Sequence, residues 1–185
     1  PVHDRRKDFP RQGRGADRSR VMNGALNAKT RRAVLQIAGW QEGVVEMPSN
    51  SNKVKYNTAY YGREVSGSAY PWCMAFVWWV FREAGFSLYK TASCTAFVNR
   101  YRVYAPRQIV TSGFQPGDIV FFDFSGKRSK TEHIGIVAGV VGSTILTIEG
   151  NTGTGNDANG GVVMKRRRNV GLITVGVRPG YPDPA

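Results

Sequence analysis

The sequence contains few of the residues that build metal centres and disulfide frameworks. Its 185 residues include only two cysteines, Cys73 and Cys94, and two histidines, His3 and His133. A single optional bridge is not a disulfide scaffold, and the spacing of these four residues matches no zinc-ligand pattern. We therefore expect neither a disulfide-rich fold nor a structural zinc site.

Long apolar runs are also missing. No segment approaches the roughly 18–20 apolar residues that a bilayer-spanning helix needs, so we expect no membrane span. The N-terminus is charged and no apolar core segment follows it, so no signal peptide is expected within the printed sequence.

Acidic residues are scarce relative to basic ones. The chain has 13 Asp and Glu against 26 Lys and Arg, a net charge of +13. Residues 1–32 alone hold 10 basic and 3 acidic side chains, a net charge of +7. Such an excess attracts polyanions, whether nucleic acid, anionic lipid or anionic wall polymers, although a solvated tail is the simpler interpretation.

Composition predicts one domain with a tail at each end. Residues 1–20 are rich in Arg, Asp and Gly and have no apolar period, which is typical of disorder. We expect a basic disordered tail over residues 1–27, a folded domain over 28–180 and a short tail over 181–185. Hydrophobic residues make up 41% of the chain, which is enough for a substantial core.

The hydrophobic period predicts helices first and strands afterwards. Helical spacing occurs over about 28–43, over 72–85 and, more briefly, over 93–102, whereas residues 48–71 read as a loop. Strand patterns follow over 118–124, 134–141, 143–149, 161–168 and 172–177. This order predicts an α+β fold in which N-terminal helices pack on an antiparallel sheet.

Cys73 stands in the first turn of the predicted helix 72–85. Free backbone N–H groups and the helix dipole favour a thiolate there and offer part of an oxyanion hole. Taken alone, a free cysteine is more often a small buried apolar residue. Cys94 lies in a different predicted helix with no histidine near it in sequence, so we assign it no catalytic role.

His133 and Glu149 supply the other two groups that cysteine chemistry needs. His133, at the start of a predicted strand, is the one histidine outside the tail and suits the role of base. If the strands after His133 and before Glu149 form a hairpin, Glu149 lies beside the ring and orients it. Asn151 follows as a further polar support. The bland alternatives are a surface histidine and a strand-end charge.

Together these segments resemble a CHAP domain, the cysteine- and histidine-dependent amidohydrolase/peptidase family. The resemblance covers about residues 36–179 and is carried by four motifs: Trp72–Val77, Pro116–Phe122, His133–Val137 and Glu149–Thr152. It implies a papain-like α+β fold with Cys73 as nucleophile, His133 as base, and Glu149 and Asn151 as orienting residues. It also implies cleavage of amide bonds in peptidoglycan, as in phage and prophage lysins.

The sequence departs from that family pattern before the nucleophile. Some relatives hold calcium with clustered aspartates there, whereas Glu64 is the only acid between Asn50 and Cys73. A hard cation needs several oxygen ligands, so we expect no metal in this loop and no cofactor. Tyr61, twelve residues before Cys73, is a candidate second oxyanion donor, or else a wall of the cleft. Trp72 is expected to line the cleft.

The sequence therefore predicts a peptidoglycan hydrolase, either an endopeptidase or an N-acetylmuramoyl-L-alanine amidase. We expect a monomer that acts on the wall outside the cell, with the basic tail attracted to anionic wall polymers and no specific nucleic acid as partner. The alternatives are a papain-like amidase with a non-wall substrate and a non-catalytic basic protein that binds wall or nucleic acid. The basic residues do not alternate with aromatic ones as in single-strand nucleic-acid binders.

Overall fold

The computed structural model describes residues 29–182. Its elements run in the order α2 (Arg31–Gly39), α3 (Lys55–Tyr61), α4 (Cys73–Glu83), α5 (Cys94–Tyr104), β1 (Ile109–Val110), β2 (Ile119–Phe122), β3 (His133–Val141), β4 (Thr144–Thr152), β5 (Val162–Asn169) and β6 (Ile173–Val177). Two short 3-10 helices, Pro106–Gln108 and Val170–Leu172, precede β1 and β6. The predicted α+β order is confirmed.

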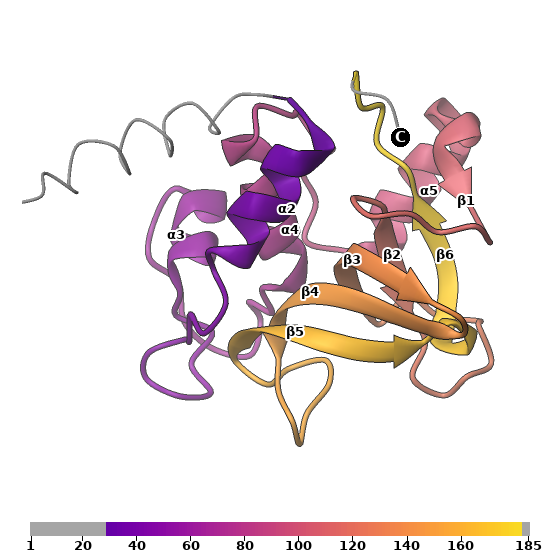
Figure 1. Cartoon of the computed structure of the whole chain (residues 1–185). Helices are drawn as coiled ribbons and strands as arrows, with labels where there is room; N and C mark the ends of the chain where they lie inside the picture. Colours follow the sequence, from indigo (N-terminus) through magenta and orange to yellow (C-terminus); the bar gives the residue numbers. More distant parts are fainter. Residues whose placement is uncertain (1–28, 183–185) are drawn as a thin grey trace, which may run out of the picture.

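The strands form one six-stranded antiparallel sheet in the order β1-β6-β2-β3-β4-β5. Figure 1 shows α2, α3 and α4 gathered beside the sheet, with α5 at the end that holds β1 and β6. The strands β3, β4 and β5 are joined in chain order as a meander, so residues 133–169 form a local unit. The predicted hairpin between His133 and Glu149 is the pair β3–β4.

The helices form where the sequence provides both an apolar face and a start signal. Thr30 and Ser93 cap α2 and α5, each accepting a hydrogen bond from a backbone N–H three residues on, as side-chain caps do. By contrast, α4 begins after Trp72 with no side-chain cap. The start of α4 therefore keeps backbone N–H groups free.

The expectation that residues 48–71 form only a loop is wrong, because α3 lies inside that segment. Tyr56, Asn57 and Tyr60 give α3 a buried side, and Gly62 ends the helix in the left-handed conformation, with φ of 71°. Gly is the residue that adopts this conformation without strain. Asn and Gly residues around the helix concealed its short apolar period.

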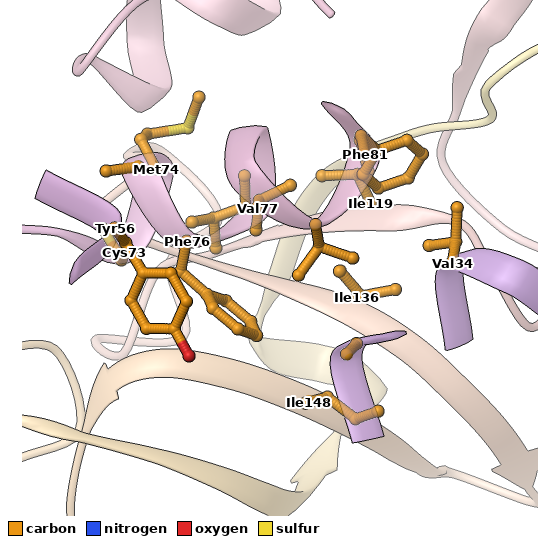
Figure 2. Close-up of a cluster of buried hydrophobic side chains, with 14 of the residues drawn as sticks. Val34, Tyr56, Cys73, Met74, Phe76, Val77, Phe81, Ile119, Ile136 and Ile148 are labelled. Atoms are coloured by element: carbon orange, nitrogen blue, oxygen red, sulfur yellow. The ribbon is translucent and has the colours of Figure 1, made fainter. Parts of the chain in front are cut away.

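The main core lies between α4 and the sheet. Phe76 and Val77 of α4 face Ile136 of β3 and Ile148 of β4, as Figure 2 shows. A second cluster occupies the other face of the strands, with Val120, Phe122, Val137, Ile145 and Ile173. Side chains of a strand alternate between faces, which explains why neighbouring residues of β2 belong to different clusters.

The two expected tails have different outcomes. The N-terminal tail, 1–27, lies outside the described residues. Tyr181, expected in the C-terminal tail, instead packs on the domain: its hydroxyl donates to the Gly117 carbonyl at 2.7 Å and its ring contacts Phe86. Tyr181 therefore contacts the domain directly.

Gly150 fixes the distance between α4 and β4. A Cβ at Gly150 would lie 2.5 Å from the Phe76 Cβ, closer than real Cβ atoms approach. We expect Gly150→Ala to destabilise the protein by about 1–3 kcal/mol through overpacking, measured as a lower Tm in thermal unfolding. The control is Gly155→Ala, where nothing lies within 4 Å of the added atom. Equal Tm values for the two variants would contradict this account of the packing.

Candidate active site

Cys73 is the first residue of α4 and lies at the edge of the main core. It is 6% exposed, whereas His133, Glu149 and Asn151 are each 0% exposed. The first intrahelical bond runs from the Phe76 N–H to the Trp72 carbonyl. The N–H groups of residues 73–75 are therefore available to a negative charge at the helix start.

The Cys73 thiol is strongly acidified by its surroundings. The pKa of Cys73 is held well below its usual value, first by a hydrogen bond from the Cys94 thiol, then by the adjacent His133 ring and the Met74 backbone N–H. Burial acts in the opposite direction. The lowered pKa means that Cys73 is the thiol that carries the negative charge.

Cys94 is closer to the site than the sequence suggested. It begins α5, just as Cys73 begins α4, and both cysteines are free and buried. Donation to Cys73, together with burial, raises the pKa of the Cys94 thiol. Sequence distance from a histidine was therefore the wrong criterion, because two helix starts that are remote in the chain bring their first residues together.

His133 is held from one side by Glu149. The His133 Nε2 and the Glu149 Oε2 are 3.1 Å apart, which leaves Nδ1 for the thiol. Within the described residues, Nδ1 is buried and makes no hydrogen bond of regular geometry. The ring and the thiol are thus adjacent without an aligned hydrogen bond, which is common for a catalytic pair before substrate binds.

The pKa values of His133 and Glu149 move apart in the way an ion pair requires. Burial alone would favour the neutral imidazole, but Cys73 and Glu149 raise the pKa of His133 to about 9. Burial likewise opposes ionisation of Glu149, but hydrogen bonds from His133 and Arg168 lower its pKa to about 2. At neutral pH the site therefore holds a thiolate, an imidazolium and a carboxylate.

Two neighbours that the sequence analysis missed complete the surroundings of Glu149. Thr147 donates its hydroxyl to Glu149 Oε1 at 2.6 Å, and Arg168 donates to both carboxylate oxygens. Thr147 and Glu149 lie two apart on β4, so they share a face of the strand. Arg168 stands in the basic run of β5, which gave no sign of burial because three of its neighbours are also basic.

Asn151 does not orient His133, contrary to the sequence-based expectation. Its Nδ2 donates to Asn159 Oδ1 at 2.9 Å, and its Oδ1 accepts from the Gly161 backbone N–H at 3.2 Å. Both polar atoms are thus committed to the loop between β4 and β5. Asn151 has a positive φ of 59° and lies where the pairing of β4 with β5 shifts register, between Glu149 and Thr152.

The loop held by Asn151 borders a groove. This cavity of about 460 Å³ is lined by loop residues 153–156, Asn159 and Gly160, with Asn50, Val162 and Met164. Its wall therefore combines the side-chain amides of three asparagines with glycine backbone and apolar surface from Val162 and Met164. Asn159, which lines this groove, accepts the hydrogen bond from Asn151.

The two aromatic candidates for the site, Trp72 and Tyr61, lie in different surroundings. Trp72 does not line a cleft: its ring is fully buried, stacks on Tyr56 and donates its Nε1–H to Glu46. Tyr61 is half-buried and packs edge-on against Tyr60 and Tyr70. No hydrogen bond between Tyr61 and Cys73 is found within residues 29–182, and the role of Tyr61 as an oxyanion donor stays a prediction.

The loop before Cys73 does not fit a calcium ion. Its one acid, Glu64, is paired with Lys53 at 2.8 Å and points into solvent. Across the described part of the chain, no three His, Cys, Asp or Glu side chains gather as a metal site would require. None of the described helices is both long and apolar enough to cross a membrane.

Comparison with known proteins agrees with this geometry. The family model of the CHAP domain matches residues 65–151, and no curated protein matches the chain. The crystal structure of a wild-type endolysin, LysIME-EF1, is similar with a TM-score of 0.54 at 13% identity, over 83% of this chain and 65% of that one. The crystal structure of Ly7917 has a TM-score of 0.47 at 18% identity, over 81% of this chain and 62% of that one.

This chain thus spans less than two thirds of the length of those solved structures. The likeness to the endolysin concerns the fold, an α+β arrangement with helices packed on an antiparallel sheet. The matched segment runs from the loop before Cys73 to the end of the buried polar site, and it includes the thiol, the imidazole and the carboxylate. Residues 65–151 of this chain are therefore similar to the CHAP domain family.

Proposed function

We propose that this protein is a peptidoglycan hydrolase that cuts an amide bond in bacterial wall peptide with Cys73 as nucleophile. The observation that carries the proposal is the buried set of Cys73, His133 and Glu149, in which the thiol pKa is lowered and the imidazole pKa is raised. This pairing is the resting state of cysteine hydrolases. The CHAP family match supports wall peptide as the substrate class.

The reaction proceeds in two halves. The Cys73 thiolate attacks the amide carbon, and the N–H groups at the start of α4 stabilise the oxyanion. The His133 imidazolium gives its proton to the departing amine, which leaves a thioester on Cys73. The ring, now neutral, takes a proton from water, whose oxygen attacks the thioester and releases a carboxylic acid and the thiolate.

The groove beside the loop of β4 and β5 supports a peptide-like substrate. The asparagine side chains of its wall offer both donors and acceptors to a peptide backbone, and Asn159 of that wall is bonded to Asn151 of β4. The bond cut is that of either an endopeptidase or a muramoyl-alanine amidase. Mass spectrometry of the released muropeptides distinguishes these, because only the amidase frees the whole stem peptide from the sugar.

The place of action follows from the substrate. Peptidoglycan lies outside the cytoplasmic membrane, so the enzyme works there after release or secretion, as a monomer and without a cofactor. The basic segment 1–27 serves to hold it near anionic wall polymers by charge, which salt screens.

The two cysteines provide a direct test of the function. We expect Cys73→Ser to lower turnover of purified peptidoglycan by several orders of magnitude, because nucleophile and base act as a unit. Cys94→Ser should keep most activity, since its hydroxyl can still donate to the Cys73 thiolate. The measurement is muropeptide release, with iodoacetamide-treated enzyme as an inactive control. Full activity of Cys73→Ser would refute the proposal.

The pH dependence tests the roles of His133 and Glu149. The active form needs a protonated His133, so activity is lost as the pH rises through the pKa of that ring. Glu149→Gln removes a negative charge that raises this pKa, and the alkaline limb of kcat/KM should therefore move to lower pH. The rate should fall less than in His133→Ala, which we expect to be nearly inactive. An unchanged rate and limb in Glu149→Gln would exclude Glu149 from the site.

Deletion of residues 1–27 tests the basic segment. We expect unchanged turnover of soluble wall peptides, because the described domain begins later, but weaker binding to whole sacculi at low salt. High salt should abolish the difference between the two forms, since it screens exposed charges. Equal binding of both forms to sacculi at low salt would contradict this role.

A further inference from the structure

Arg168 is a buried cation that joins two carboxylates. It is 6% exposed, its Nε and Nη2 donate to Glu149 at 3.0 and 2.6 Å, and its Nη1 donates to Asp157 at 2.7 Å. A bidentate arginine fixes a carboxylate in both position and orientation. The guanidinium also lies over the Phe124 ring, 4.9 Å from its centroid, so its plane is held by more than its charge.

Glu149 needs this second cation because His133 changes charge during the reaction. In the resting state the imidazolium compensates the fully buried carboxylate. Once the ring has given its proton to the leaving amine, the imidazole is neutral. An unpaired buried carboxylate is costly and tends to take up a proton. Among the described residues, Arg168 is the cation that still contacts Glu149 at that stage.

We propose, on the basis of the hydrolase function above, that Arg168 is a positioning residue that keeps Glu149 charged and oriented in both protonation states of His133. Through Asp157, which lies in the loop beside the groove, the same guanidinium ties the substrate side of the site to the carboxylate. Arg166 holds Asp157 from a second direction. The hydrogen bonds of Arg168 to Glu149 and Asp157 thus link strand β4, strand β5 and the loop between them.

Several charged or titratable groups surround Glu149 and Arg168. His133 of β3 and Asp157 of the loop contact the pair directly, whereas Cys73 of α4 acts on His133, Cys94 of α5 on Cys73, and Arg166 of β5 on Asp157. Arg168 is the cation among them that touches the carboxylate of the site directly and does not titrate near neutral pH. Removing the charge of Arg168 should therefore shift the pKa values of these groups in a known direction.

Loss of a nearby positive charge raises the pKa of every group in the site. In Arg168→Gln, the pKa values of Cys73, Glu149 and His133 all rise. The acid limb of the pH–rate profile, where the thiolate or the carboxylate is lost, moves to higher pH. The alkaline limb, where the imidazolium is lost, moves to higher pH as well. Glu149→Gln removes a negative charge and moves the same limbs to lower pH.

The experiment compares kcat, KM and the pH profile of wild type, Arg168→Gln, Arg168→Lys and Arg167→Gln. Arg167 is the matched control, because it is the adjacent residue of β5 and is exposed to solvent. We expect Arg168→Gln to lower kcat by roughly 10- to 100-fold, as when the support of a metal-bound histidine is removed. Both limbs should rise by roughly one pH unit, while Arg167→Gln should match wild type.

Arg168→Lys separates charge from geometry. It keeps the positive charge but loses the two-pronged hydrogen bond, so its limbs should stay near those of wild type while kcat falls. If Arg168→Gln does not fold, a lower kcat in Arg168→Lys than in Arg167→Lys supports the proposal, and equal values overturn it. A folded Arg168→Gln enzyme with unmoved limbs also overturns it, because a purely structural role lowers the rate without shifting the profile.

Alkylation of Cys73 gives the same information without a substrate. The rate of reaction with iodoacetamide, followed by mass spectrometry of the Cys73 peptide, reports the thiolate fraction against pH. Its lower inflection should rise in Arg168→Gln and stay in place in Arg167→Gln. If wild-type enzyme does not release muropeptides, the proposed function fails, whereas an inflection that does not move in Arg168→Gln overturns the role of Arg168 independently of that function.

Discussion

The whole site depends on keeping one carboxylate charged where no water reaches it. Glu149 is fully buried, and a lone charge in such surroundings would neutralise itself. The fold meets this constraint with three partners of Glu149: His133 from β3, Thr147 from β4, the strand of Glu149 itself, and Arg168 from β5. The raised pKa of His133, and through it part of the lowered pKa of Cys73, follows from that arrangement.

A second requirement is that the thiol meets this set of groups at the correct distance. The packing of Phe76 against Gly150 determines how closely α4 approaches β4. Gly135 of β3 likewise leaves room for a side chain of the neighbouring strand β4, because an added Cβ there would lie 2.9 Å from the Glu149 side chain. Two positions without side chains thus leave room for an acid and for an aromatic ring in a crowded core.

The sequence was sufficient to predict the α+β class, the five longer strands and the helix that begins at Cys73, because each has a clear hydrophobic period. The hairpin between His133 and Glu149 was predictable for the same reason. By contrast, α3 was missed because a seven-residue helix between turn residues has too little period to detect. The two-residue strand β1 is shorter still.

The partners within the site were harder to predict than its members. The contact of Cys94 with Cys73 depends on the meeting of two helix starts, and the burial of Arg168 depends on which face of β5 turns toward Glu149. Asn151 has a suitable side chain for orienting a ring, but its two polar atoms bond to the loop between β4 and β5. These contacts are determined by tertiary packing, which the local hydrophobic pattern of the sequence does not reveal.

The meander of β3, β4 and β5 has a consequence for how the site assembles and fails. The pairs His133–Glu149 and Glu149–Arg168 are separated by only 16 and 19 residues in the chain, so they close short loops at small entropic cost. Cys73 joins them through α4 across a much longer separation in the chain, and closing a longer loop costs more entropy. His133, Glu149 and Arg168 thus form one local unit within the meander of β3, β4 and β5. Catalysis therefore depends on the packing of α4 against this unit, because that packing brings Cys73 to the base.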